Sequence, residues 1–164
     1  MRLTHLDEAG RARMVDVGDK PASRRTAVAE GRVRMSAEAF GAVEQQAVAK
    51  GDVLRVAEVA GTMAAKRTGE LIPLCHPLGL DLVQVEAELD RKLPGVVVTA
   101  TVGTVSRTGV EMEALTAVAV GCLTVYDMVK ALDRAMTIEG VQLLSKTGGT
   151  RGDYRRGAVE DDAP

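Results

Sequence analysis

The sequence predicts an α+β fold of the ferredoxin-like type, a β-α-β-β-α-β sandwich whose antiparallel sheet carries its helices on one face. Two observations support this. Hydrophobic patterning gives the order strand, helix pair, strand, strand, helix, strand. A chain of 164 residues with 46% apolar and 27% charged residues is globular and fits one domain. We place that domain at residues 25–147, between a flexible N-terminal arm (1–24) and a glycine-rich flexible tail (148–164).

The first half of the domain is predicted to contain one strand and two helices. Apolar and polar residues alternate imperfectly over residues 26–35, which favours a strand. Ser36 supplies a capping hydroxyl for a helix that we expect to end near Gly51. Asp52 can cap a second helix, which should stop before Pro73 because proline disfavours helix in the preceding residue.

The second half is predicted to contain a hairpin, a long helix and a last strand. Residues 71–80 hold two prolines and a glycine and should form an ordered turn. Residues 82–89 alternate as a strand with one wet face, and residues 96–105 return after the Pro94-Gly95 turn. A helix over residues 111–132 and a strand over residues 138–144 complete the fold.

Residues 114–126 are almost all apolar or small. A helix that is hydrophobic all round must be covered on a second side, and in a chain this short we expect another subunit to cover it. The segment is shorter than the roughly 20 residues of a membrane span. The N-terminus also lacks the apolar run of a signal peptide. We therefore expect an oligomer in the cytoplasm, with no membrane partner.

Charge and aromatic content exclude other classes of partner. The chain has 21 basic and 23 acidic residues, without the basic excess of nucleic-acid-binding proteins. Its three aromatic residues are too few to stack bases. Cys75 and Cys122 lack a metal or redox spacing, and we expect both to be reduced and buried. No nucleic-acid partner and no metal site are predicted.

Two pairs of charged residues have both a structural and a functional interpretation. Asp127 and Lys130 lie on one face of the predicted helix, where they can form either a proton-transferring pair or an exposed ion pair. The spacing alone favours the exposed ion pair. Glu111 and Glu113 either complement the dipole at the helix start, the simpler interpretation, or act on a substrate as acid, base or ligand.

His76 and the glycine-rich C-terminal stretch also leave alternatives open. An interior histidine is more often a hydrogen-bonded structural residue than a catalyst, and His5 is the only other histidine. Residues 140–147 resemble a phosphate-binding loop, but the order of elements is wrong for that motif. Lys146 with the Gly148-Gly149 backbone can still bind an anion, although a solvated tail is the simpler account.

Five longer motifs occur in the order of one known family. They are Lys50-Gly51-Asp52, Ala65-Lys66-Arg67-Thr68, Leu71-Ile72-Pro73-Leu74-Cys75-His76-Pro77-Leu78, Thr108-Gly109-Val110-Glu111-Met112-Glu113-Ala114-Leu115 and Tyr126-Asp127-Met128-Val129-Lys130. On these motifs the chain resembles the molybdenum cofactor biosynthesis protein C family, the cyclic pyranopterin monophosphate synthases, over about residues 3–154.

The resemblance implies a phosphorus-oxygen lyase. The family converts (8S)-3′,8-cyclo-7,8-dihydroguanosine 5′-triphosphate into cyclic pyranopterin monophosphate and diphosphate, in molybdenum cofactor biosynthesis. It also implies a homohexamer, a trimer of dimers, with active sites at subunit interfaces. No cofactor is expected to be required, and a magnesium ion accompanying the triphosphate is compatible with the chemistry.

The resemblance also implies roles for individual residues. Acid-base work is assigned to Asp127, Lys130 and Lys50. The cationic residues among the other site positions suit the triphosphate, and Glu113 suits the guanidine-like edge of the base. The positions expected to bind substrate are Leu74, Cys75, His76, Met112, Glu113, Arg25, Lys66, Glu111 and Lys146. The competing hypotheses are a non-catalytic oligomeric module that binds a nucleotide or pterin, and an oligomeric scaffold. A pure binder would have no need of the Asp127–Lys130 pair.

Overall fold

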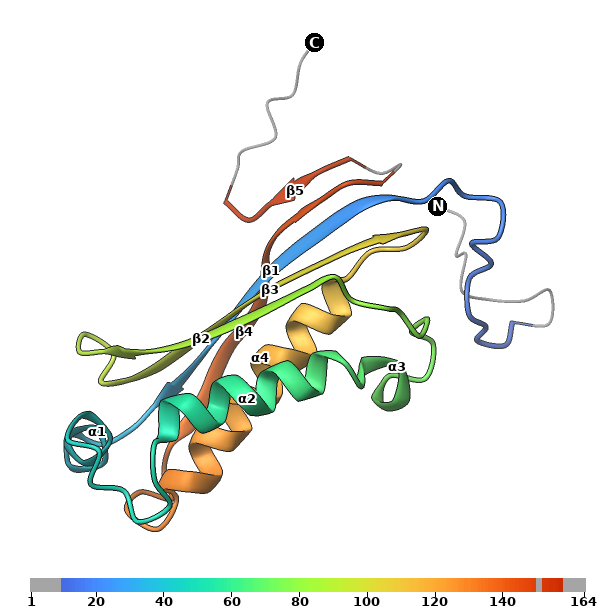
Figure 1. Ribbon diagram of the computed structural model, residues 1–164. Coiled ribbons are helices and arrows are strands. Elements are labelled where there is room, and N and C mark those ends of the chain that lie inside the picture. Colours follow the sequence, from blue (N-terminus) through green and yellow to red (C-terminus); the bar gives the residue numbers. More distant parts are fainter. Residues whose placement is uncertain (1–9, 150–151, 158–164) are drawn as a thin grey trace.

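The computed structural model describes residues 10–149 and 152–157. One antiparallel sheet runs through it in the order β2-β3-β1-β4-β5 (Figure 1). The strands are β1 (Ser23–Arg34), β2 (Leu82–Asp90), β3 (Gly95–Ser106), β4 (Thr137–Thr147) and β5 (Tyr154–Arg155). The helices are α1 (Ala37–Glu44), α2 (Val53–Ala65), α3 (Thr68–Leu71) and α4 (Glu111–Val129).

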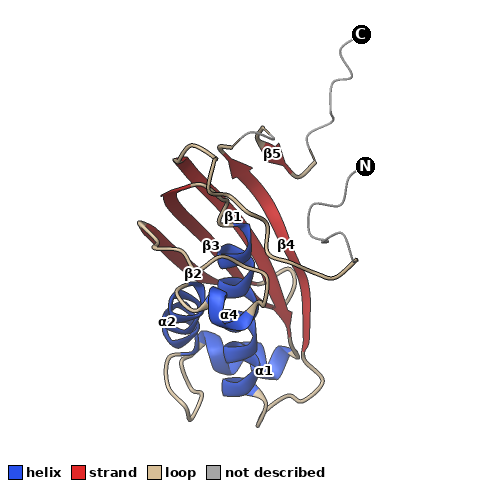
Figure 2. Ribbon diagram, turned by 90° about the vertical axis from the view of Figure 1, so that its right-hand side faces the viewer, coloured by secondary structure: helices blue, strands red, loops and turns tan. Residues whose placement is uncertain are grey.

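The topology confirms the predicted ferredoxin-like fold. β1 lies in the middle of the sheet and pairs antiparallel with both β3 and β4, while β2 and β3 form a hairpin. The connection through α2 and the connection through α4 each skip one strand, which gives the split β-α-β arrangement of this fold. Both helices lie on the same face of the sheet (Figure 2).

Small residues allow α4 to approach the sheet closely. Ala27, Ala29 and Val33 of β1 are buried on the helix-facing side, and Gly31 stands between them in the same alternation. A Cβ atom on Gly31 would lie 2.5 Å from Val118 Cγ1 of α4. Gly31 therefore sets the distance between the central strand and the central helix.

The apolar surface of α4 is covered largely from within the chain. α4 packs against the sheet and against α2, and ten of its residues are buried. It is long and apolar enough to span a membrane by length and composition, but 56% of its most apolar window is buried inside the protein, as in a core helix. Exposed apolar side chains remain on α2, where Val56, Val59 and Met63 recur at helical spacing, and at Leu123 of α4.

Three local features differ from the sequence-based expectation. The helix predicted to run from the Asp52 cap toward Pro73 is divided into α2, which ends at Ala65, and the short α3. α1 ends at Glu44 rather than near Gly51, because the chain enters the left-handed region at Gln46, with φ of 53°. β5 was not predicted, since it falls in the segment expected to be a flexible tail. It pairs with β4 through Ser145 and Lys146.

We expect Gly31→Ala to lower the free energy of unfolding by about 1–3 kcal/mol, since the added methyl overpacks the contact with Val118. Gly41→Ala is the matched control. Gly41 lies inside α1 with nothing within 4 Å of its Cβ position, so alanine should stabilise the protein by up to about 1 kcal/mol. Urea denaturation measures both. Equal stability of the two variants would contradict the role given to Gly31.

Candidate functional site

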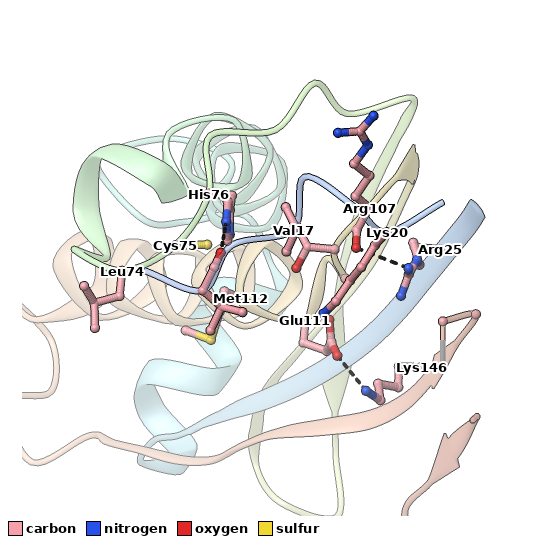
Figure 3. Close-up of a pocket in the computed structure, with 15 residues that line it drawn as sticks. Val17, Lys20, Arg25, Leu74, Cys75, His76, Arg107, Glu111, Met112 and Lys146 are labelled. Atoms are coloured by element: carbon pink, nitrogen blue, oxygen red, sulfur yellow. Dashed lines mark hydrogen bonds and ion pairs between the residues drawn. The ribbon is translucent and has the colours of Figure 1, made fainter. Parts of the chain in front are cut away.

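A cavity of about 420 Å³ opens at the end of the sheet where α4 begins (Figure 3). It is bordered by the N-terminal segment, β1, the loop after α3, the β3–α4 connection and the end of β4. Its lining comprises Val15, Val17, Lys20, Arg25, Leu74, Cys75, His76, Arg107, Thr108, Gly109, Glu111, Met112, Lys146, Gly148 and Gly149. Most of the predicted substrate-binding residues thus come together in one place.

Strand register explains this convergence. In an antiparallel sheet the start of a central strand lies beside the ends of its two neighbours. Arg25, near the start of β1, is opposite Thr104 of β3, and Ala27, two residues further along β1, is opposite Lys146 of β4. Because β3 leads directly into α4, the same end of the sheet also receives Glu111 and Met112.

The cavity is rich in positive charge. Lys20, Arg25 and Lys146 extend into it, and Glu111 is the carboxylate among its described lining residues (Figure 3). Lys146 Nζ forms an ion pair with Glu111 Oε1 at 3.0 Å. Arg25 donates to the carbonyl oxygen of Arg107 at 3.4 Å, while its buried Nε has no partner within the described part of the chain. A ligand bearing several negative charges would satisfy these donors.

Arg107 contributes its backbone rather than its charge to this geometry. Figure 3 shows its guanidinium directed away from the cavity, while its carbonyl oxygen faces Arg25. Sequence reasoning did not single out Lys20, because a lone lysine in a segment without periodicity carries no signal of its own. Only the folded position of residues 15–20 brings Lys20 to the site.

Two glycines that follow β4 pack closely against Arg24 and Arg25 at the edge of the cavity. Gly148 and Gly149 have φ values of 85° and 96°, a region that other residues rarely adopt. A Cβ on Gly148 would collide with the carbonyl oxygen of Arg24, and one on Gly149 would collide with the Arg25 guanidinium. This glycine pair is therefore part of the cavity rather than only a solvated tail.

Glu113 lies beside a second, smaller cavity of about 160 Å³, whose lining also includes Lys66. The side chain of Glu113 is buried, with 2% exposure. Cys75 Sγ donates to its Oε1 over 3.6 Å, and its Oε2 has no partner among the described residues. Burial raises the pKa of Glu113. Since Cys75 lines the first cavity, this contact connects the two.

The three predicted acid-base residues form a cluster of their own. Asp127 Oδ1 is 2.6 Å from Lys130 Nζ, and Asp127 Oδ2 is 2.6 Å from Lys50 Nζ. Lys50 also donates to the backbone carbonyl of Asp127 at 2.9 Å. The hydrogen bonds from Lys130 and then Lys50 lower the pKa of Asp127 to about 2. The carboxylate is therefore ionised at neutral pH, where it can position both ammonium groups but has no proton to donate.

This cluster lies far from the large cavity within one chain. Met112 is in the first turn of α4 and Asp127 is in the last, 15 residues further on. A rise of 1.5 Å per residue separates them by about 22 Å. The predicted site residues thus fall into three groups: the large cavity, the Lys66–Glu113 cavity and the Lys50–Asp127–Lys130 cluster. Spacing did predict the Asp127–Lys130 pairing, while Lys50 joins it only through the fold.

Within the described ranges, no three His, Cys, Asp or Glu side chains are grouped so that they could hold a metal ion. The donors that converge on the large cavity are instead cationic, and they suit phosphate or carboxylate oxygens.

The fold and the site define a ferredoxin-like domain with a cationic cavity, suited to an anionic small molecule, at the end of its sheet. The particular family is shown by comparison with known proteins. The model of the MoaC family matches residues 14–149, and the chain belongs to this family.

Individual relatives cover nearly the whole chain. A protein of Thermomicrobium roseum is 60% identical over 160 residues, which are 98% of this chain and 95% of the relative. One from Cereibacter sphaeroides is 58% identical over 156 residues, covering 95% of this chain and 98% of the relative. One from a Methylobacterium species is 60% identical over 152 residues, covering 93% and 95%. All three are named cyclic pyranopterin monophosphate synthase.

We expect Cys75 to resist alkylation at neutral pH. Burial, followed by the charge of Glu113, raises the pKa of its thiol from 9.0 to about 11. This lowers the reactive thiolate fraction about a hundredfold at neutral pH. Glu113→Gln removes the charge, so the thiol pKa should fall and the rate–pH profile should shift to lower pH.

Peptide-level mass spectrometry after iodoacetamide treatment measures the rate. Cys122, which is fully buried, serves as the internal reference for unfolding, because it should stay unmodified in both proteins. A rate–pH profile of Cys75 that is unchanged in Glu113→Gln would contradict the interaction between the two side chains.

Proposed function

We propose that this chain is a cyclic pyranopterin monophosphate synthase, a phosphorus-oxygen lyase. It would convert (8S)-3′,8-cyclo-7,8-dihydroguanosine 5′-triphosphate into cyclic pyranopterin monophosphate and diphosphate, a step of molybdenum cofactor biosynthesis. The relatives' shared name supports this proposal, and the observation that carries it is the cationic cavity, whose lining also includes residues of the family's motifs.

The triphosphate would bind at the cationic end of this cavity. Among the described residues, Arg25 bonds only to a backbone carbonyl at long distance, so its guanidinium is available for phosphate oxygens. Lys146 is paired with Glu111 and would exchange this partner for the substrate. As the ribose hydroxyl attacks the α-phosphorus in line, these cations would stabilise the negative charge that develops on the departing diphosphate.

The base would be held without aromatic stacking. Leu74 and Met112 line the cavity with apolar side chains. The Oε2 atom of Glu113, which has no partner among the described residues, could accept a hydrogen bond from the guanidine-like edge of the base. Glu113 is close to this wall because its carboxylate contacts Cys75, which lines the same cavity.

Proton transfers would be carried out by the lysines of the Lys50–Asp127–Lys130 cluster. Rebuilding the purine-derived ring as a pterin moves protons between nitrogen and oxygen atoms, which requires groups that donate and accept. Lys50 and Lys130 would donate as ammonium groups and accept as the amines that donation leaves, while Asp127 holds both nitrogens within 2.6 Å of its carboxylate. A non-catalytic binding module would have no use for this cluster.

A complete active site would need two subunits. The separation of about 22 Å between the cavity and the cluster, estimated from the helical rise, supports this because no single chain brings them together. The exposed apolar stripe of α2 supports an oligomer. We therefore propose a homohexamer, a trimer of dimers, with sites at subunit interfaces. It would act in the cytoplasm without a resident cofactor, and any magnesium ion would arrive with the triphosphate.

Asp127→Ala and Lys130→Ala should each lower diphosphate release from the cyclised nucleotide by at least about a hundredfold, the scale of acid-base catalysis. Lys92→Ala, at an exposed position in the β2–β3 turn, is the matched control and should keep wild-type activity. A coupled diphosphate assay measures release. A wild type without activity, or full activity in both variants, would be incompatible with the proposed function.

Subunit complementation tests the shared site. Lys146→Ala should disable the cavity and Asp127→Ala the cluster, so each variant alone should be inactive. When the two chains are co-assembled at random, about a quarter of the sites should combine an intact cavity with an intact cluster and regain activity. Sedimentation should show six copies of the 17.3 kDa chain. A stable monomer, or no recovery in a verified mixed assembly, would refute the shared site.

A further inference from the structure

We propose that His76 anchors the N-terminal segment across the large cavity, and that this segment supplies Lys20 as a further binding residue for the anionic part of the ligand. The inference rests on the proposed function in taking that anionic part to be a polyphosphate chain. It assigns a role to residues 15–20, of which Val15, Val17 and Lys20 line the cavity.

The anchor is one short hydrogen bond between segments far apart in the sequence. His76 Nε2 lies 2.8 Å from the carbonyl oxygen of Val15 (Figure 3). A carbonyl oxygen can only accept, so Nε2 must carry the hydrogen. In the neutral ring this leaves Nδ1 as an acceptor, and Nδ1 has no partner among the residues that the structure describes. The two ring nitrogens thus have different roles: Nε2 donates to the N-terminal segment, and Nδ1 can accept a hydrogen bond from a ligand.

A tight turn follows the anchor and directs Lys20. Asp16 Oδ1 accepts from the backbone N–H of Gly18 at 2.8 Å, and the N–H of Lys20 donates to the carbonyl of Val17 at 3.1 Å. The side chains of Val15 and Val17 are half-buried and line the cavity. The segment is therefore fixed at Val15 and turned back between Asp16 and Lys20.

Lys20 completes the positive side of the cavity. Its side chain extends from the N-terminal segment into the cavity toward Glu111 (Figure 3). Within the described part of the chain it forms no ion pair, whereas Lys146 is bound to Glu111 at 3.0 Å. Arg25, Lys146 and Lys20 come from β1, β4 and the N-terminal segment, so they surround the cavity from three elements. Charges arranged in this way fit the several oxygens of a linear polyphosphate better than those of one carboxylate.

Titration calorimetry with inorganic triphosphate tests Lys20 directly. Loss of one charge-assisted contact should weaken binding about tenfold in Lys20→Ala. Arg13→Ala is the control, since it removes a positive charge from the same segment at an exposed position outside the cavity lining. It should bind like the wild type. Equal affinity of wild type and Lys20→Ala, or an equal loss in both variants, overturns the role of Lys20.

A pair of substitutions at His76 tests the anchor. The side-chain amide nitrogen of glutamine can take the position of Nε2 and donate to the Val15 carbonyl. The amide nitrogen of asparagine takes only the position of Nδ1, so this hydrogen bond is lost. Hydrogen exchange of the amides of Gly18 and Lys20 should accelerate about fivefold or more in His76→Asn, the scale of one lost hydrogen bond, and stay near wild type in His76→Gln. Unchanged exchange in His76→Asn, or equally fast exchange in both, overturns the anchor.

Double variants connect the two parts of the proposal. With the anchor lost, adding Lys20→Ala to His76→Asn should weaken triphosphate binding less than twofold further, while adding it to His76→Gln should still cost about tenfold. Equal costs in both backgrounds would show that Lys20 acts without the anchor and overturn the proposal. Lys20-dependent triphosphate binding by a wild type that releases no diphosphate would instead refute the proposed function and leave this inference standing.

Discussion

The simultaneous antiparallel pairing of β1 with β3 and β4 is the constraint on which the rest of the structure depends. It places the start of the central strand beside the ends of both neighbours, so that Arg25, Lys146 and the β3–α4 connection meet at one end of the sheet. It also requires α4 to cross the centre of the sheet, which Gly31 permits by leaving room for Val118. The cavity is thus a consequence of strand register rather than of any single loop.

α4 carries candidate site residues at both of its ends. Its first turn carries Glu111 and Met112 to the cationic cavity, and its last turn carries Asp127 to the two lysines. A rigid helix keeps these ends about 22 Å apart, a distance set by its rise per residue. Such an arrangement suits a site assembled from two chains, because each chain can offer one end of the helix to its neighbour.

Charged residues are nearly balanced over the whole chain but are unevenly distributed in space. The formal net charge of the chain is −2, yet the described lining of the large cavity contains more cationic than acidic side chains. A few residues away, burial raises the pKa of Glu113 and of Cys75, whose side chains are in contact. One end of the sheet therefore combines a cationic cavity with a buried carboxylate, two environments that suit the two ends of the proposed nucleotide substrate.

The sequence by itself determined the fold class, the element order and the family, since alternating strands, the caps at Ser36 and Asp52 and the long motifs are local patterns. It also predicted the Asp127–Lys130 pair, because helical spacing fixes such neighbours. Only the tertiary structure decided that Lys50 joins this pair, that Val15 holds His76, that Lys20 reaches the cavity, and that β5 extends the sheet. These contacts join segments that no local period relates, and strand register, helix length and chain reversal bring them together.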